Sequence, residues 1–135
     1  MENSSSKPPK NTTKQAGDAA ESEALRYLKQ QGLHLLQRNY RTPGRGGGEI
    51  DLIMATRDGT TVFVEVRARG AGTHGGAAAS IGFAKQRRIV FAARHYLAQQ
   101  RNTPPCRFDV VLVDGALADA EPEWLRGAFD ASGYV

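Results

Sequence analysis

Two short segments carry charged side chains at alternate positions, Glu49 and Asp51 in the first and Glu65 and Arg67 in the second. Residues two apart in a β-strand point to the same face, so each segment can present its charges together. Carboxylates on adjacent strands repel one another unless a cation neutralises them, and hard oxygen ligands favour magnesium or manganese. The spacing therefore permits an Mg²⁺ or Mn²⁺ site. Cross-strand ion pairs on a solvated strand pair, such as Glu49 with Arg67, are the alternative that spacing leaves open.

The pairing register of these two strands decides whether the acids meet. The pattern predicts strands over residues 49–55 and 60–67, with a hairpin loop at residues 57–59. A two-residue turn would put Asp51 opposite Val66, whereas a three-residue loop, with Gly59 in the third position, would put Asp51 opposite Glu65 and Glu49 opposite Arg67. Both loops fit the local sequence. We favour the three-residue loop, because it leaves one face of the strand pair charged and the other face apolar. The apolar face would consist of Ile50, Leu52, Met54, Val62, Val64 and Val66.

A fourth acid belongs to the first predicted helix, residues 18–31, which Gly32 is placed to end. Glu21 lies at helical spacing from the apolar residues of that helix, which are Ala24, Leu25 and Leu28. An unpaired carboxylate on an apolar face is costly, which favours a functional role. A glutamate in the first turn also favours a helix N-terminus, and both interpretations stay open.

The remaining elements follow from hydrophobic periodicity and from glycine and proline positions. We expect strands at 33–40 and 108–113, a helix at 83–101, and loops at 41–48 and 70–76. The expected order is αβββαβ, and the segment at 124–129 has no assignment. Asp109 is expected to accept a structural hydrogen bond from Arg107 or a helix terminus, and Trp124 to lie in the core.

Length and composition indicate one α/β domain at residues 18–135 behind a polar tail, residues 1–17, that we expect to be disordered. The chain has 135 residues and a net charge of +4, which permits binding to a polyanion without requiring it. Its single cysteine, Cys106, is expected to be a buried, reduced thiol. The sequence contains no secretory signal or membrane-spanning stretch, so we expect a cytoplasmic protein with no membrane partner.

GEIDLI at residues 48–53, followed by FVEVRAR at residues 63–69, resembles the signature of PD-(D/E)XK nucleases. The chain resembles the YraN family of bacterial proteins in particular, over residues 17–129. The resemblance implies a restriction-endonuclease-like αβββαβ core with a mixed sheet flanked by helices. This nuclease superfamily also includes Holliday-junction resolvases and some RNA-processing enzymes.

The resemblance also implies site residues and an activity. Asp51 and Glu65 would ligate Mg²⁺ or Mn²⁺, Glu49 would support them, and Glu21 would reach the site from the first helix. Arg67 stands where the nuclease signature has lysine. Arginine stays protonated and cannot act as a general base, so Arg67 would serve as an electrostatic partner. The implied activity is that of a metal-dependent endonuclease on DNA or structured nucleic acid, with DNA favoured over RNA and a homodimer as one arrangement.

Basic residues are candidates for phosphate contacts, namely Arg41 and Arg45 in the glycine-rich loop and Lys85 and Arg88 on the long helix. A solvated helix face would show the same stripes of charge. Two other functions stay open. The chain can be a non-catalytic nucleic-acid-binding module on a nuclease fold, or a protein-interaction adaptor whose basic surface serves solubility.

Overall fold

A mixed five-stranded sheet forms the centre of the molecule, in the order β1-β2-β3-β4-β5. The structure is a computed structural model that describes residues 12–44, 46–69, 80–114 and 121–131. Only β3 and β4 pair in parallel, while the other neighbours are antiparallel. The elements in chain order are α1 (Thr12–Gln30), β1 (His34–Arg41), β2 (Glu49–Ala55), β3 (Thr61–Arg69), α3 (Phe83–Ala98), β4 (Cys106–Asp114) and β5 (Glu123–Phe129). The expected α/β class, with the αβββαβ order of a restriction-endonuclease-like core, is confirmed, and β5 extends the sheet.

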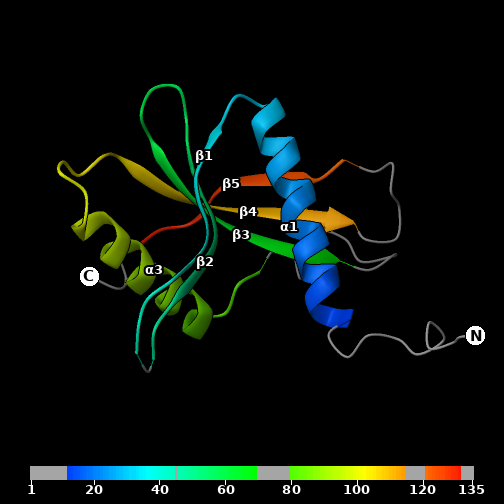
Figure 1. Cartoon of the computed structure of the whole chain (residues 1–135), viewed down its shortest axis with the longest axis horizontal. Coiled ribbons are helices and arrows are strands. Elements are labelled where there is room, and N and C mark those ends of the chain that lie inside the picture. Colours follow the sequence, from blue (N-terminus) through cyan, green and yellow to red (C-terminus); the bar gives the residue numbers. More distant parts are fainter. Residues whose placement is uncertain (1–11, 45, 70–79, 115–120, 132–135) are drawn as a thin grey trace, which may run out of the picture.

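Helices cover both faces of this sheet, as Figure 1 shows. On one face, Ala24 and Leu28 of α1 pack in a cluster with Leu52 of β2 and Val64 of β3. On the other face, α3 contributes a second cluster that also contains Tyr40, Ile50, Ile53, Phe63 and Phe108. The prediction of one dry face and one charged face for β2 and β3 is therefore wrong. Because α3 packs on the face that was expected to be charged, the acids share this face with the second apolar cluster.

Side-chain alternation along β2 breaks at Asp51. Ile50 belongs to the α3 cluster and Leu52 to the α1 cluster, although residues two apart in a regular strand share a face. Directly across on β1, Asn39 adopts a positive φ of 56° between the pairs formed by Arg38 and Tyr40. The two strands therefore twist sharply at this point, and Asp51 sits at the twist.

The ends of the helices differ from the predicted ends. Residues 12–17, expected to be disordered, form the first turns of α1, because Lys14, Gln15 and Ala16 have favourable helix propensities. The predicted end of α1 is confirmed within one residue. Gly32, with a φ of 99°, donates its N–H to Lys29 O at 3.0 Å, and Leu33 donates to Leu28 O at 3.1 Å. This pattern is a Schellman motif.

Helix α3 ends at Ala98, three residues before the predicted end at Arg101. The prediction took the prolines at 104 and 105 as the stop, whereas the last hydrogen-bonded turn closes at Gln100, whose N–H donates to Leu97 O at 3.0 Å. Cys106 is exposed, so the prediction of a buried thiol is wrong. It begins β4 at the rim of the sheet, and the continuous buried run of that strand starts only at Phe108.

Candidate metal and nucleic-acid site

The β2–β3 hairpin adopts the register that brings the two predicted ligands together. Thr56 donates its N–H to Thr60 O at 2.9 Å, and Gly59, with a φ of 93°, donates to Thr56 O at 3.2 Å. The favoured three-residue loop is thereby confirmed, and the ladder runs from Ala55↔Thr61 to Leu52↔Val64. Asp51 and Glu65 follow as the next residues on their strands. A glycine in the left-handed conformation, two residues before the second strand, thus sets the position of an acid on each strand.

The regular ladder between β2 and β3 ends at the Leu52↔Val64 pair, and side-chain contacts of the acids take its place beyond that pair. The Asp51 carboxylate accepts a hydrogen bond of 2.8 Å from the backbone N–H of Val66, at the twist in β2. Asp51 also forms side-chain hydrogen bonds with both Glu65 and Glu21. The carboxyl groups of Glu21, Asp51 and Glu65 therefore form one chain of contacts in which Asp51 is central.

Burial and the charge of Asp51 make Glu21 and Glu65 hold protons near neutral pH. The pKa of Glu65 is raised from 4.5 to about 7, mainly by burial and then by the charge of Asp51, while Lys85 opposes the rise. Burial also raises the pKa of Glu21 to about 7, again with a contribution from Asp51, while Arg38 opposes it. A cation placed among these carboxyl groups would displace protons and remove the repulsion.

Glu21 lies on α1 well past its first turn, because the helix begins at Thr12. The interpretation of Glu21 as a first-turn residue is therefore wrong, and its place on the apolar face needs another explanation. Its Oε1 atom lies 3.5 Å from Arg38 Nε, and neither atom has a hydrogen-bond partner among the described residues, although both are buried. Arg38 is held instead by Ser22 Oγ at 3.0 Å and by Asp18 O at 3.2 Å. Glu21 thus keeps a buried oxygen available for another partner.

Lys85, from the first turn of α3, reaches the acids. Its Nζ lies 3.1 Å from Glu65 Oε2, and Glu65 is only 7% exposed. The sequence placed Lys85 among the phosphate-binding residues, but it gave no sign of this ion pair. By contrast, Arg67 Nη1 donates to Ser80 O at 2.6 Å. Lys85, rather than Arg67, therefore provides the cation that lies beside Glu65.

Glu49 is separated from the three contacting acids. The β2–β3 ladder does not reach Glu49 and Arg67. Glu49 pairs instead with Arg41 of the neighbouring strand β1. Its carboxylate lies 3.7 Å from the Arg41 guanidinium, and both side chains are largely exposed. Glu49, Arg41 and Glu21 nevertheless line one cavity of about 300 Å³, together with Gly17, Asp18 and Asn39. This cavity opens beside the acids, at the N-terminal half of α1.

The arrangement fits a hard divalent cation held by few protein ligands. Across the described residues, no three His, Cys, Asp or Glu side chains come close enough to form a complete metal site. Magnesium often binds through only one or two carboxylates and keeps water or phosphate oxygens as its other ligands. Asp51 and Glu65 would supply such a pair, and Oε1 of Glu21, which accepts no hydrogen bond among the described residues, would add a further oxygen.

The other predicted phosphate contacts are distributed around this site. Arg41 lines the cavity, and Arg88 is exposed on α3. Arg45 lies outside the described residues, and so does the second expected loop, at residues 70–76. No helix within the described ranges combines the length and apolar character needed to cross a lipid bilayer.

Residues 20–113 match a family model described as "Uncharacterised protein family UPF0102". The chain belongs to the UPF0102 family. It is 68% identical over 120 residues to the UPF0102 protein of Albidiferax ferrireducens, which covers 89% of this chain and 91% of that protein. It is 63% identical over 124 residues to the UPF0102 protein of Acidovorax sp. strain JS42, covering 92% and 91% of the two chains. The resemblance to the YraN family is thereby confirmed, and the region matched to the UPF0102 model includes Glu21, Asp51, Glu65 and Lys85.

Proposed function

We propose that this UPF0102 protein is a metal-dependent endonuclease that hydrolyses phosphodiester bonds in DNA or structured nucleic acid. The observation that carries the proposal is the contact chain of Glu21, Asp51 and Glu65, in which burial and repulsion raise two pKa values to about 7. Buried acids that repel one another are costly to the fold, and such perturbed groups are concentrated at functional sites. The exposed thiol of Cys106 suits a reducing compartment, so we place this activity in the cytoplasm.

Asp51 and Glu65 would hold Mg²⁺ or Mn²⁺, which supplies an acidified water and neutralises charge on the phosphate. The Val66 N–H fixes the orientation of the Asp51 carboxylate at 2.8 Å, so this ligand is already in position before a cation binds. Glu65 must release its proton and loosen its ion pair with Lys85 to become a ligand. Lys85 would then be free to face the negative charge that builds up on the phosphate.

Among the described residues, Arg41 is the one basic residue lining the cavity beside the acids, which is also lined by Asp18, Glu21 and Glu49. Arg41 lies at its rim, where a phosphate can compete with Glu49 for the guanidinium. The 3.7 Å separation of this exposed pair is long for an ion pair, so little would be lost on exchange. Arg41 is therefore placed to guide a strand toward Glu21 and Asp51.

A second candidate function is a non-catalytic nucleic-acid-binding module. One observation favours it: Lys85 already neutralises Glu65, and no complete set of three metal ligands is present among the described residues. A lysine that permanently replaces the cation would leave a basic, phosphate-binding surface without hydrolysis. The two candidates differ in whether Mn²⁺ displaces Lys85 from Glu65.

Isothermal titration with MnCl₂ and MgCl₂ tests the proposal. We expect the wild-type chain to bind Mn²⁺ at pH 7 and to release protons, so that the measured heat changes with the ionisation enthalpy of the buffer. Asp51→Asn should abolish this binding, whereas Glu123→Gln, which removes an exposed acid on β5, should leave it intact. Absence of Mn²⁺ binding in the wild type, or unchanged binding in Asp51→Asn, would overturn the metal site.

Cleavage of branched, single-stranded and duplex DNA in the presence of Mn²⁺ separates the two candidates. The endonuclease requires cleavage that Asp51→Asn eliminates. Lys85→Gln should retain Mn²⁺ binding but reduce cleavage by about a hundredfold to a thousandfold, the scale of one lost electrostatic contact to the transition state. Salt-sensitive DNA binding by a chain that binds no Mn²⁺ and cuts none of these substrates would favour the non-catalytic module.

A further inference from the structure

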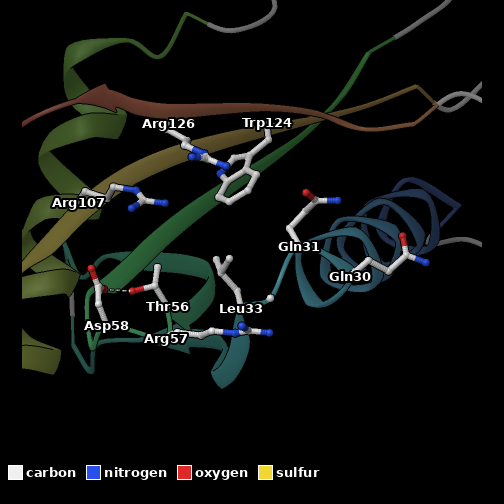
Figure 2. A pocket seen from close by; sticks show the side chains of 10 residues that line it. Gln30, Gln31, Leu33, Thr56, Arg57, Asp58, Arg107, Trp124 and Arg126 are labelled. Carbon is white, nitrogen blue, oxygen red and sulfur yellow. Dashed lines mark hydrogen bonds between the residues drawn. The ribbon is translucent and has the colours of Figure 1, made fainter.

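A second cavity, of about 540 Å³, lies at the other end of α1 from the acids. It is formed by Gln30 and Gln31 at the end of α1, by the hairpin loop between β2 and β3, and by the paired strands β4 and β5. Figure 2 shows Arg107, Trp124 and Arg126 on one side of the cavity and Arg57 on the other. Its size lies within the range of cavities that hold small organic ligands, roughly 300–1,000 Å³.

The lining of this cavity is basic. Three arginines line it, from three different parts of the chain, against a single carboxylate, Asp58. Within the described residues, neither Arg57 nor Arg126 forms an ion pair. Asp58 is engaged by the hydroxyls of Thr56 and Thr60 and by the Thr60 N–H at 3.2 Å. These hydrogen bonds lower its pKa, so it stays ionised as part of the hairpin loop.

A buried carboxylate holds two of the arginines in position. Asp109 is 0% exposed and accepts hydrogen bonds from Arg107 Nε at 3.1 Å, from Trp124 Nε1 at 2.8 Å and from the Gly127 N–H at 2.9 Å. The guanidinium of Arg126 lies 4.0 Å from the centre of the Trp124 ring, within the range of a cation–π contact. Asp109 thus fixes Arg107 directly, and it fixes Arg126 through the indole that Arg126 covers.

Guanidinium groups held in this way are suited to oxyanions. An arginine that is already stacked on an aromatic ring loses less conformational entropy on binding, and its planar N–H edges match the geometry of phosphate. Side-chain amides of Gln30 and Gln31 add neutral donors at the side formed by α1. We propose that this cavity binds a phosphate group, carried either by a free nucleotide or by the backbone of a nucleic-acid strand. The site is independent of the metal site and of the proposed hydrolysis.

Trp124 is the only tryptophan of the chain and lines the cavity, so its fluorescence reports on binding there. The probe is inorganic pyrophosphate, titrated at low salt without divalent metal. We expect a saturable fluorescence change that weakens as salt rises. Arg57→Gln and Arg126→Gln should each weaken pyrophosphate binding by about tenfold, the scale of one lost charge-assisted hydrogen bond. Arg87→Gln, which removes an exposed arginine on α3 outside the cavity, should leave binding unchanged.

Asp58→Asn supplies the opposite test, because it removes the one acid of the lining and keeps an acceptor for Thr56 and Thr60. This variant should bind pyrophosphate more tightly than the wild type, a result that partial unfolding would not produce. No saturable fluorescence change, equal weakening in Arg87→Gln, or weaker binding in Asp58→Asn would each overturn the site. Competition then identifies the source of the phosphate. Displacement by ADP but not by a short oligonucleotide indicates a free nucleotide, and displacement by the oligonucleotide indicates a nucleic-acid backbone.

Discussion

At the scale of single residues, Glu65 shows how one position serves the site at a cost to the fold. It is 7% exposed, lies beside Asp51, and has Lys85 as its counter-charge. Burial raises its pKa from 4.5 to about 7 because the ionised form is poorly solvated there. The protonated form therefore stabilises the fold below about pH 4.5, and this contribution is lost as the pH rises through about 7.

Glu65→Gln replaces the acid with a neutral side chain of the same shape, so it should remove this dependence on pH. Without divalent metal, we expect the variant to be more stable than the wild type at pH 8 by about 1–2 kcal/mol, and to differ little at pH 5. Urea unfolding at the two pH values measures the difference. Added Mn²⁺ should stabilise the wild type at pH 8 and leave the variant unaffected. If the free energies of unfolding of the wild type and of Glu65→Gln changed with pH in the same way, Glu65 would have its ordinary pKa.

At the scale of elements, the approach of β2 to α3 depends on a glycine in the GEIDLI segment. A Cβ at Gly48 would lie 2.0 Å from the carbonyl oxygen of Arg88 in α3, far inside a van der Waals contact. The Gly48 N–H also donates a hydrogen bond of 2.6 Å to Oγ1 of Thr42, the residue that follows β1. The strand that carries Asp51 therefore begins in direct contact with the backbone of the helix that carries Lys85.

Gly48→Ala should force β2 and α3 apart. We expect a loss of about 1–3 kcal/mol in the free energy of unfolding, the scale of an overpacked core, and weaker Mn²⁺ binding because Asp51 moves relative to Lys85. Gly17→Ala is the matched control, since a Cβ there meets nothing within 4 Å and the residue is helical. It should stabilise the chain by about 0.5–1 kcal/mol through helix propensity. Equal stability of the two variants would contradict the close contact.

At the scale of the whole molecule, β5 is attached to the sheet by a polar contact inside an apolar core. Asp109 of β4 joins Arg107, Trp124 and Gly127 through its two carboxylate oxygens and has no exposed surface. The two cavities lie on either side of the sheet centre along α1, and Glu21 is about 14 Å from Gln30 at 1.5 Å of helical rise per residue. One helix therefore spans both sites, and the stability of the sheet edge affects only the second.

Asp109→Ala should destabilise the chain by about 3 kcal/mol, roughly 1 kcal/mol for each of the three donors (Arg107, the Trp124 indole and the Gly127 N–H) that lose their acceptor. Glu123→Ala, which removes the exposed partner of Arg69 at 2.9 Å, should cost less than about 1 kcal/mol. Guanidinium chloride unfolding compares the two variants. A similar loss in both would mean that Asp109 contributes no more than a surface ion pair.

The sequence by itself determined what local geometry controls. The local sequence allows two hairpin loops, and the apolar residues of β2 and β3 favour the three-residue loop with Gly59 third, which puts Asp51 and Glu65 on neighbouring positions. Strand β2 was predicted with its observed bounds, and Gly32 marked the end of α1 within one residue. These features depend on residues close together in the chain, where turn chemistry and a period of two leave few alternatives.

Only the tertiary structure decided which groups surround the acids. Lys85 and Arg38 reach Glu65 and Glu21 because helices pack on both faces of the sheet, and no short-range pattern specifies such a docking geometry. The same holds for the arginines of the second cavity, which come from the hairpin loop, β4 and β5. Contacts between distant segments depend on the three-dimensional packing of the whole core, and for that reason the sequence alone could place the acids but not their partners.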